Sequence, residues 1–238
     1  MKISLVLPAF NEAQNIRLAV QAALDYLENK DGEVVVVDDG STDDTPTILR
    51  DLTNAHAGRV RVVTHPTNLG YGTSLRDGFA AATGDWIFYT DSDLQFEIGE
   101  IDLFLPHLNE AQILVGFRKD RKDPLPRIFA AGTYNRIMRF LFGVRVRDID
   151  CAFKVFRKDV FEKITIESTG FLVDAEILVK ADRLGMKIYE TGVTHLPRKF
   201  GESTVRFRHV MDTLRGIAWL WNRVNRHAGT FERQRVRG

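Results

Sequence analysis

Cysteine is almost absent from this sequence, since Cys151 is the single thiol among 238 residues. One cysteine cannot form an internal disulfide, and it cannot make a thiolate metal site by itself. Such usage suits a reducing compartment, and a small residue packed in the core is the ordinary role of a lone thiol. We therefore expect a cytoplasmic protein.

An excess of charge of one sign is also absent. The 33 lysines and arginines nearly balance the 32 aspartates and glutamates, so the net charge is +1. A charge this small gives no argument for nucleic acid or another strongly acidic partner, and none is expected. The hydrophobic content of 44% is ordinary for a globular protein, and the length fits one α/β domain with or without an appendage.

Long apolar runs are missing as well. No segment reaches the roughly 18 uninterrupted apolar residues that a membrane-spanning helix needs. The N-terminal run in MKISLVLPAFNE stops at Pro8 and is too short for a signal peptide. We expect no transmembrane helix and no signal peptide, so any contact with a membrane would be made at its surface.

The sequence instead contains short apolar runs that alternate with helical patterns. Strands are expected at 3–7, 33–41, 59–65, 86–90, 111–118, 151–156 and 187–197, and helices at about 12–29, 45–53, 72–82, 128–142, 174–184 and 204–226. Strands that are apolar on both faces, with helices between them, indicate a mostly parallel twisted sheet covered by helices on both faces. The predicted fold class is α/β.

Polar motifs stand where several of these strands end. The motifs are PAFNE, DDGSTDD and TDSDLQ, and a fourth strand delivers Arg118 to the same edge. Ligands of parallel sheets bind at the carboxyl ends of the strands. The basic, proline-broken stretch KDRKDPLPR that follows Arg118 predicts an exposed loop.

The stretch WIFYTDSDLQF runs from a buried strand into two carboxylates. If the extended geometry persists past Thr90, Asp91, Asp93 and Gln95 project to the same side. Carboxylate oxygens and an amide carbonyl suit Mg²⁺ or Mn²⁺, which binds through one or two carboxylates plus substrate phosphates. A D-x-D is a weak motif alone, but its position after a buried strand favours a metal site.

A second acidic strand end lies in VVVVDDGSTDDT. Asp38 and Asp39 cannot both lie in the core, so one acid can accept hydrogen bonds from a base or a ribose. The alternative is that these acids only cap the next helix. Gly70, Gly72 and Gly78 in NLGYGTSLRDG do not match a dinucleotide fingerprint, and they predict a tight turn and a close helix contact.

The C-terminal segment 204–226 has apolar residues at helical spacing, which predicts an amphipathic helix. From Arg198 onward there are ten lysines and arginines and three acids. Such a helix can rest on an anionic membrane surface, or it can pack on the domain with a solvated basic face. We therefore divide the chain into a catalytic domain, 1–203, and a basic helix and tail, 204–238.

Five motifs in this order carry a resemblance to a known family: LVLPAFNEAQNI, VVVVDDGSTDDT, NLGYGTSLRDGF, GDWIFYTDSDLQ and DCAFKVFR. Over roughly Ile3 to Thr204 the chain resembles the family 2 glycosyltransferases of GT-A fold, specifically the dolichol- or polyprenol-phosphate hexose synthase branch. The resemblance implies an inverting enzyme that uses a sugar nucleotide and a divalent metal.

The resemblance also assigns residues to the donor. The family's nucleotide-sugar contacts fall on Pro8, Phe10, Glu12, Val37, Asp39, Asp91, Ser92, Asp93 and Arg198. Asp93 and Gln95 match the ligands of Mg²⁺ or Mn²⁺, and Arg198 matches an arginine on a loop that closes over the diphosphate.

The acceptor side is implied by other residues. Arg118 and Arg127 match arginines that hold a donor or acceptor phosphate. A serine that this branch often carries four residues later is Ala131 here, and Thr133 is near enough to substitute for it. The implied catalytic residues are Asp91, Asp93, Arg118, Arg127 and Arg198.

The predicted reaction moves a hexose, with mannose favoured, from GDP-mannose or UDP-glucose to a polyprenyl or dolichyl monophosphate. A phosphate monoester is already anionic at neutral pH, so no general base is required, and positioning and charge stabilisation do the work. We expect a peripheral enzyme on the cytoplasmic face of a membrane. The sequence gives no indication of oligomeric state.

Two alternatives remain open at this stage. A family 2 enzyme that acts on a sugar or small-molecule hydroxyl would need a carboxylate base, for which Asp174 and Glu176 are candidates. These two acids can equally be a helix N-terminus favoured by the macrodipole. The second alternative, from another class, is an inactive nucleotide-binding partner module.

Overall fold

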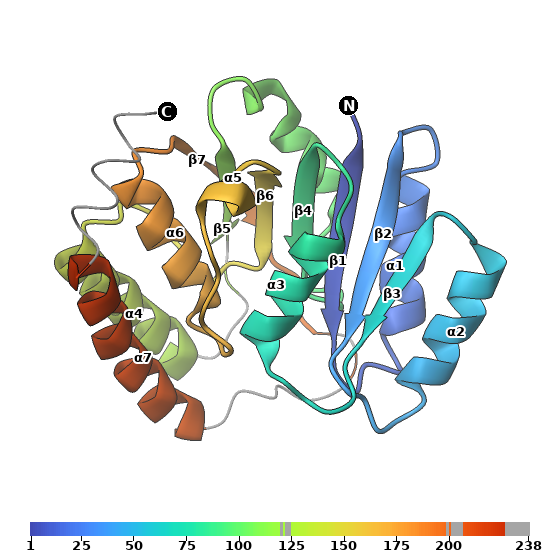
Figure 1. Ribbon diagram of the computed structural model, residues 1–238, viewed down its shortest axis with the longest axis horizontal. Coiled ribbons are helices and arrows are strands. Elements are labelled where there is room, and N and C mark those ends of the chain that lie inside the picture. The colour runs from blue at the N-terminus through green and yellow to red at the C-terminus, as the bar shows by residue number, and fades with distance from the viewer. Residues whose placement is uncertain (120, 122–124, 199, 201–206, 227–238) are drawn as a thin grey trace.

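A computed structural model describes residues 1–119, 121, 125–198, 200 and 207–226. These residues contain one seven-stranded sheet with the order β3-β2-β1-β4-β6-β5-β7 (Figure 1). The strands are β1 (Ile3–Ala9), β2 (Gly32–Asp38), β3 (Val60–Thr64), β4 (Trp86–Thr90), β5 (Ile113–Lys119), β6 (Phe153–Arg157) and β7 (Ile188–Thr194). The α/β class expected from the sequence is confirmed.

Helices connect the strands. They are α1 (Ile16–Tyr26), α2 (Thr45–Ala55), α3 (Tyr71–Ala81), α4 (Leu125–Phe142), α5 (Val160–Lys163), α6 (Val173–Arg183) and α7 (Phe207–Arg226). Two 3₁₀ helices, η1 (Ile98–Leu103) and η2 (Leu105–His107), lie between β4 and β5. The sequence reading did not anticipate α5, η1 or η2, because each is too short to show a helical period.

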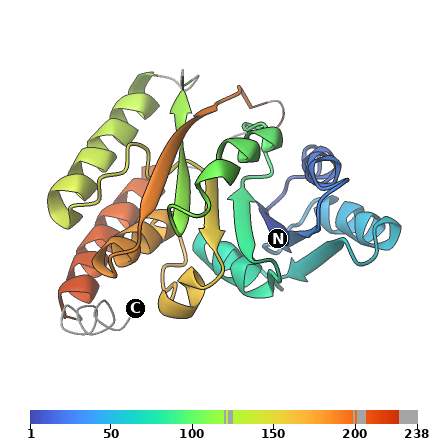
Figure 2. The same ribbon diagram turned by 90° about the horizontal axis from the view of Figure 1, so that it is seen from above.

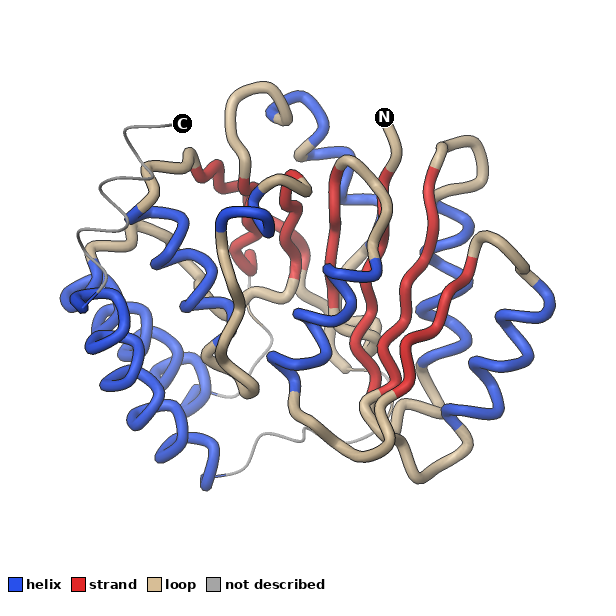
Figure 3. Tube along the Cα trace, in the orientation of Figure 1, coloured by secondary structure: helices blue, strands red, loops and turns tan. Residues whose placement is uncertain are grey.

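Strand direction decides which residues meet at the functional edge. The pairs β1–β2, β1–β4, β2–β3 and β5–β7 are parallel, whereas β6 is antiparallel to both β4 and β5. The loops that follow β1 to β4 gather at the lower edge in Figure 3. Because β6 runs the other way, it begins at this edge, and the segment that leads into it is brought there too.

Burial on both faces explains why these runs form central strands. Leu5 and Leu7 of β1 enter the core shared with α1, α2 and η1, whereas Val6 enters the core shared with α3, α4, α6 and α7. All three side chains are completely buried. Helices therefore cover both faces, as expected for a mostly parallel sheet (Figure 2).

The described part of the C-terminal segment packs on the domain. Ile217, Leu220 and Val224 of α7 are buried, and Trp221 meets Phe142 of α4 edge to face at 5.8 Å. Figures 1 and 2 both place α7 beside α4 at one end of the sheet. Of the two readings given for this segment the packed one is therefore observed, and contact with a membrane stays a prediction.

Helix length and hydropathy also bear on the membrane question. Among the residues described by the structure, none of the helices combines the length and the apolar character needed to cross a bilayer.

Candidate active site

The acidic turn after β4 lies at the functional edge of the sheet. The chain turns after Thr90, and Leu94 has a φ of 61°, so the strand geometry does not continue as the simplest reading assumed. Asp91 accepts a hydrogen bond from the hydroxyl of Tyr71 at 2.8 Å, whereas Asp93 faces Arg198. The two carboxylates therefore have different partners and can have different roles.

The environment of Asp91 disfavours its charged form. Burial, followed by the charge of Asp93, raises the pKa of Asp91 to about 7. A cation bound beside these acids would oppose that shift by favouring the ionised carboxylates.

The two predicted metal ligands, Asp93 and Gln95, lie close together in this turn. Asp93 is 7% exposed, and its Oδ1 accepts the backbone N–H of Gln95 at 3.2 Å. The Gln95 amide nitrogen donates to the carbonyl of Leu196 at 3.2 Å and lies 3.3 Å from His195 Nε2. No group of three or more His, Cys, Asp or Glu suited to a metal occurs within the described residues. A site made of Asp93, Gln95 and substrate phosphate oxygens does not need such a group.

Arg198 joins segments that are far apart in sequence. Its Nη2 donates to Glu12 at 2.5 Å, its Nη1 lies 3.5 Å from Asp93 Oδ2, and its Nε donates to the carbonyl of Phe200 at 2.8 Å. Asn15 holds the other oxygen of Glu12 at 2.5 Å. Three residues predicted for the donor site, Glu12, Asp93 and Arg198, are thus brought together.

Asp38 ends β2 and Asp39 follows it, and the two acids are only 1% and 4% exposed, so the expectation that they could not both be buried is wrong. Asp39 Oδ1 is 2.7 Å from His65 Nδ1 and accepts the N–H of Leu69 at 2.8 Å, while Asp39 Oδ2 accepts the N–H of Gly70 at 2.9 Å. His65 also lies 3.2 Å from Asp77. Sequence reasoning missed His65, although a histidine at the end of an apolar strand was a usable signal.

The remaining predicted nucleotide contacts line the same edge. Ser92 donates its hydroxyl to the carbonyl of Pro8 at 2.9 Å, which ties the acidic turn to β1. Pro8 and Val37 are buried within the sheet, and Phe10 is half-buried just beyond β1. A nucleotide could therefore meet Val37 mainly through its backbone.

The glycines before and within α3 permit a close approach of two chain segments. A Cβ on Gly70 would lie 2.4 Å from the carbonyl oxygen of Thr169, and one on Gly72 would lie 2.2 Å from that of Ser168. Gly70 also has a φ of 97°. The expected tight turn and close helix contact are confirmed.

A buried cation lies under the site. The ammonium of Lys154, which is completely buried, contacts Asp174 Oδ1 at 2.8 Å, the carbonyl of Cys151 at 2.6 Å and the hydroxyl of Tyr89 at 3.2 Å. The Tyr89 hydroxyl also donates to Asp174 Oδ1. Cys151 itself is buried, and burial raises its pKa to about 12, which fits a core thiol.

Glu176, the second candidate base after Asp174, lies away from the acidic turn. Glu176 is completely buried and accepts the backbone N–H groups of Glu167 and Ser168 at 3.0 and 2.8 Å. It also pairs with Lys180 at 2.6 Å. Glu176 therefore holds the loop before α6, and the structure does not bring it together with the acidic turn.

The predicted acceptor residues lie around β5 and α4. Arg118 pairs through two nitrogens with Asp148, both at 2.7 Å. Arg127 lies in the first turn of α4, and its side chain is outside the described residues. Thr133 is exposed and donates its hydroxyl proton to the carbonyl of Phe129 at 3.0 Å, so it would have to break this bond to donate to a phosphate.

Comparisons with known proteins agree with this arrangement. Residues 4–165 match the family model described as glycosyl transferase family 2. The glycosyltransferase AglD of Haloferax volcanii is 32% identical over 210 residues, which cover 83% of this chain and 34% of AglD. An undecaprenyl-phosphate 4-deoxy-4-formamido-L-arabinose transferase of an Enterobacter species is 29% identical over 219 residues, which cover 90% of this chain and 65% of the relative. The chain thus spans between about a third and two thirds of these relatives.

Solved structures support the fold. Glucosyl-3-phosphoglycerate synthase from Mycobacterium tuberculosis, solved with Mn²⁺, UDP and glucosyl-3-phosphoglycerate, superposes with a TM-score of 0.64 at 21% identity. The match covers 98% of this chain and 79% of that one. At this identity the likeness shows the architecture, which is the GT-A fold expected from the sequence motifs.

Proposed function

The chain belongs to glycosyl transferase family 2, and from this premise we propose that it transfers a hexose, with mannose favoured, to a polyprenyl or dolichyl monophosphate. The donor would be a nucleotide sugar such as GDP-mannose or UDP-glucose. The Enterobacter relative supports the acceptor class, because its name gives undecaprenyl phosphate as the acceptor.

We base this choice of a phosphate acceptor on the contacts that already occupy the two candidate bases, Asp174 and Glu176. A hydroxyl acceptor needs a carboxylate that can take its proton. Glu176 is buried among Lys180 and two backbone amides, and Asp174 is paired with Lys154 and Tyr89. Both carboxylates are therefore engaged by protein groups and are poorly placed to accept a proton from a substrate. A phosphate monoester needs none, because its second pKa is near 6.

The donor is proposed to bind at the ends of β1, β2 and β4. Asp39 and Asp91 would contact the nucleoside, and Glu12 would hold Arg198 near the diphosphate. Asp93 and Gln95 would hold Mg²⁺ or Mn²⁺, which neutralises the charge of the diphosphate when bound. Structures of the mycobacterial synthase contain Mn²⁺ or Mg²⁺ with UDP, which supports a divalent metal here.

The proposed displacement balances without a proton transfer to the protein. An oxygen of the acceptor phosphate forms a bond to the anomeric carbon, the bond from that carbon to the diphosphate oxygen breaks, and the configuration inverts. Arg198, already 3.5 Å from Asp93, would stabilise the charge on the departing nucleoside diphosphate. The arginines at β5 and α4 would hold the attacking phosphate in line.

An inactive nucleotide-binding module is the alternative from another class. Such a module would have no need to hold Asp93, Gln95 and Arg198 together, as they are here. This clustering supports an enzyme, in agreement with the family.

A peripheral position on the cytoplasmic face of a membrane is part of the proposal. The segment 125–147 contains five arginines and no acid, and Phe129 and Phe140 on α4 are 78% and 87% exposed. Exposed aromatic side chains beside arginines suit an anionic lipid surface. Replacing Phe129 and Phe140 by serine should reduce co-flotation with anionic liposomes, and unaltered flotation would count against this surface.

A transfer assay tests the function directly. GDP- and UDP-sugars are offered with Mg²⁺ or Mn²⁺ to a short-chain polyprenyl phosphate and, as a matched acceptor, to the corresponding polyprenol. We expect glycosylated lipid phosphate and no product from the alcohol. Transfer to the alcohol would favour the hydroxyl alternative, and donor binding without turnover would favour the inactive module.

A further inference from the structure

His65 is held between two carboxylates that come from different elements. It follows β3, its ring Nδ1 lies 2.7 Å from Asp39 Oδ1, and its Nε2 lies 3.2 Å from Asp77 Oδ2 of α3. The backbone N–H of His65 donates to the carbonyl of Asp38 at 2.9 Å. The side chain of His65 is only 6% exposed. Contacts at the backbone and at both ring nitrogens therefore fix the orientation of the imidazole.

Asp39 is close to saturated with hydrogen bonds from the protein. An ionised carboxylate only accepts hydrogen bonds, and its two oxygens offer about four acceptor positions. Oδ1 takes one hydrogen bond from His65 and a second from the N–H of Leu69 at 2.8 Å, and Oδ2 takes one from the N–H of Gly70 at 2.9 Å. These bonds fill Oδ1 and leave about one acceptor position, on Oδ2, for a ligand.

The protein donors to Asp39 all come from one side. They belong to the segment 65–70, which joins β3 to α3 across the lower edge of the sheet (Figure 3). A Cβ on Gly40 would lie 2.4 Å from the carbonyl carbon of Thr67, so this segment packs directly on the end of β2. Asp39 donates its own N–H to the carbonyl of Ala9, the last residue of β1, at 2.9 Å. The carboxylate is thus covered from the β3 side and lies beside the strand end at which the nucleotide is proposed to bind.

Shielding from water makes the number of free acceptor positions matter. The side chain of Asp39 is 5% exposed, so a base that meets it has little water left around the contact. A donor that is left unpaired in such a place loses its hydrogen bond to water and gains nothing in return. A base with one N–H would therefore be satisfied by Asp39, whereas a base with two adjacent donors would leave one of them without a partner.

Uracil and guanine differ in this number of donors. On its base-pairing edge uracil offers one N–H, at N3, between two carbonyl oxygens. Guanine offers two neighbouring donors, N1–H and the 2-amino group, and a carboxylate binds both by accepting one on each oxygen. Asp39 cannot do so while its Oδ1 is filled by His65 and Leu69. Hypoxanthine, the base of inosine, lacks the 2-amino group and so offers a single N–H on a purine ring.

We propose that His65 is a positioning residue that fills Oδ1 of Asp39, holds the carboxylate in one orientation, and so makes the donor site select uridine over guanosine nucleotides. This inference rests on the donor site of the proposed function, and it narrows the two donor classes left open there to uridine diphosphate sugars. His65 does not touch the nucleotide, because it acts through Asp39.

Binding of nucleoside diphosphates tests this role without the acceptor. UDP, GDP and inosine diphosphate (IDP) are titrated with Mn²⁺ into the full chain by calorimetry, and the melting temperature of each protein is recorded. The variants are His65→Ala, which removes the donor, and His65→Asn, whose amide N–H can take the place of the Nδ1 donor. The control is His107→Ala. His107 is half-buried, lies 3.1 Å from Glu110, and stacks on Tyr189 near the start of β7, at the opposite edge of the sheet.

For wild type we expect UDP and IDP each to bind about tenfold more tightly than GDP, because only GDP leaves a donor unpaired. In His65→Ala the carboxylate can turn and present both oxygens, so the ratio of IDP affinity to GDP affinity should fall to about one, and UDP should bind more weakly. His65→Asn should keep the wild-type ratio, and His107→Ala should change none of the three affinities. The comparison of IDP with GDP on wild type decides the matter even if His65→Ala does not fold.

The outcomes separate this inference from the proposed function. GDP binding by wild type that equals or exceeds that of IDP and UDP would overturn the inference. An unchanged affinity ratio in a folded His65→Ala would also overturn it, and a lower melting temperature alone would then mean that His65 serves stability.

Transfer to a polyprenyl phosphate tests the proposed function independently. If transfer occurs from a GDP-sugar and not from a UDP-sugar, only the base selection by His65 is wrong. If uridine nucleotides are preferred as expected but no lipid phosphate is glycosylated, only the proposed function is wrong. If none of the three nucleotides binds, the donor site itself is wrong and both fail.

Discussion

The two sides of the functional edge hold charge in opposite ways. On the proposed donor side, made by the ends of β1, β2 and β4, the charged groups are largely buried carboxylates held by nearby donors, as Asp39 is by Leu69 and Gly70. The proposed acceptor side is made by the end of β5, the segment 143–152 and α4. There an arginine is held by an acid that is distant in the sequence, as Arg118 is by Asp148. Both proposed substrates are anions, so the donor side needs a cation as a bridge and the acceptor side does not.

For the two proposed substrates, this difference gives a physical reason why each would bind to its own side of the site. A diphosphate can be held at an acidic surface only when a divalent metal or an arginine stands between them. A monophosphate can be held directly by guanidinium groups. Variants that remove charge from one side should therefore affect one substrate and spare the other.

The largest effect is expected for Asp93→Asn. Loss of the carboxylate should remove metal-dependent donor binding and lower kcat/KM by at least roughly 10³-fold, since charge stabilisation by a metal is worth several kcal/mol. Binding is measured as the Mn²⁺-dependent rise in melting temperature with GDP or UDP. Asp51→Asn on the exposed face of α2 is the control. Turnover near the wild-type rate would show that the metal assignment is wrong.

A smaller but still large effect is expected for Arg198→Gln. The variant should lower kcat by about 10²-fold, because one preorganised donor to the leaving group is lost. The acceptor KM should not change, since Arg198 pairs with Glu12 and Asp93 on the donor side. Steady-state kinetics with each substrate varied will check this. A selective rise in the acceptor KM would show that Arg198 acts on the acceptor, and the proposed separation of donor and acceptor sides would then be wrong.

On the acceptor side, Arg127→Ala should raise the acceptor KM about tenfold through loss of a charge-assisted contact, with the donor KM unchanged. Arg136→Ala is the control, because Arg136 is exposed on the same helix. Steady-state kinetics with a short-chain polyprenyl phosphate as the varied acceptor will measure both effects. An equal response of both variants would indicate a diffuse electrostatic effect of α4 and no specific phosphate contact.

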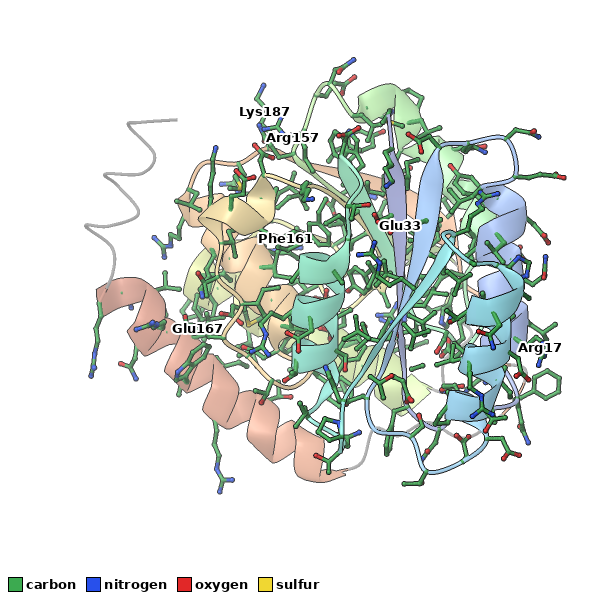
Figure 4. All side chains as sticks on the ribbon, turned by 45° about the vertical axis from the view of Figure 1, so that its right-hand side comes forward. Arg17, Glu33, Arg157, Phe161, Glu167 and Lys187 are labelled. Atoms are coloured by element: carbon green, nitrogen blue, oxygen red, sulfur yellow. The ribbon has the colours of Figure 1, made fainter. Side chains whose placement is uncertain are left out.

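The smallest effect concerns the attachment of α7, beside which Glu167 lies in Figure 4. Arg223 of α7 pairs with Glu167 at 2.5 Å, and together with Lys180 it lowers the pKa of Glu167 to about 2. Because the folded-state pKa is below the ordinary 4.5, the ionised carboxylate stabilises the fold at neutral pH, and this stabilisation is lost as pH falls from about 4.5 to about 2.

Glu167→Gln should therefore melt about 2 °C below wild type at pH 7, with the difference disappearing across that acidic window. Calorimetry at several pH values measures it, and Glu162→Gln on the exposed face of α5 is the control. A difference that persists at pH 2 would mean that Glu167 acts through packing.

Much of the donor side could be predicted from sequence because its signals are local. The strand Trp86–Thr90 was predicted with the observed bounds, since a run of large apolar residues between polar ones leaves little choice. The meeting of Glu12, Asp93 and Arg198 was implied only by the family resemblance. Spacing alone cannot bring together residues separated by 186 positions, as Glu12 and Arg198 are.

The proposed acceptor side could be predicted less well from the sequence, because the two partners of each of its key ion pairs come from different structural elements. Nothing in FKVFR states that β6 runs antiparallel, yet this direction brings Asp148 beside Arg118. Lys154 alternates with apolar residues in a buried strand, but its partner Asp174 comes from another element. The exposure of Phe129 and Phe140 likewise depends on which face of α4 the core covers.

The antiparallel insertion of β6 also has a consequence for synthesis of the chain. The strands β3, β2, β1 and β4 can pair as soon as residue 90 has emerged, but β6 begins at residue 153. At about 5–20 residues per second the ribosome needs roughly 3 to 13 seconds to cover that interval. During this time WIFYT is an open edge without a charged residue, which is the kind of edge that recruits other chains. The nascent half-sheet is therefore the stage at which we expect this protein to depend most on chaperones.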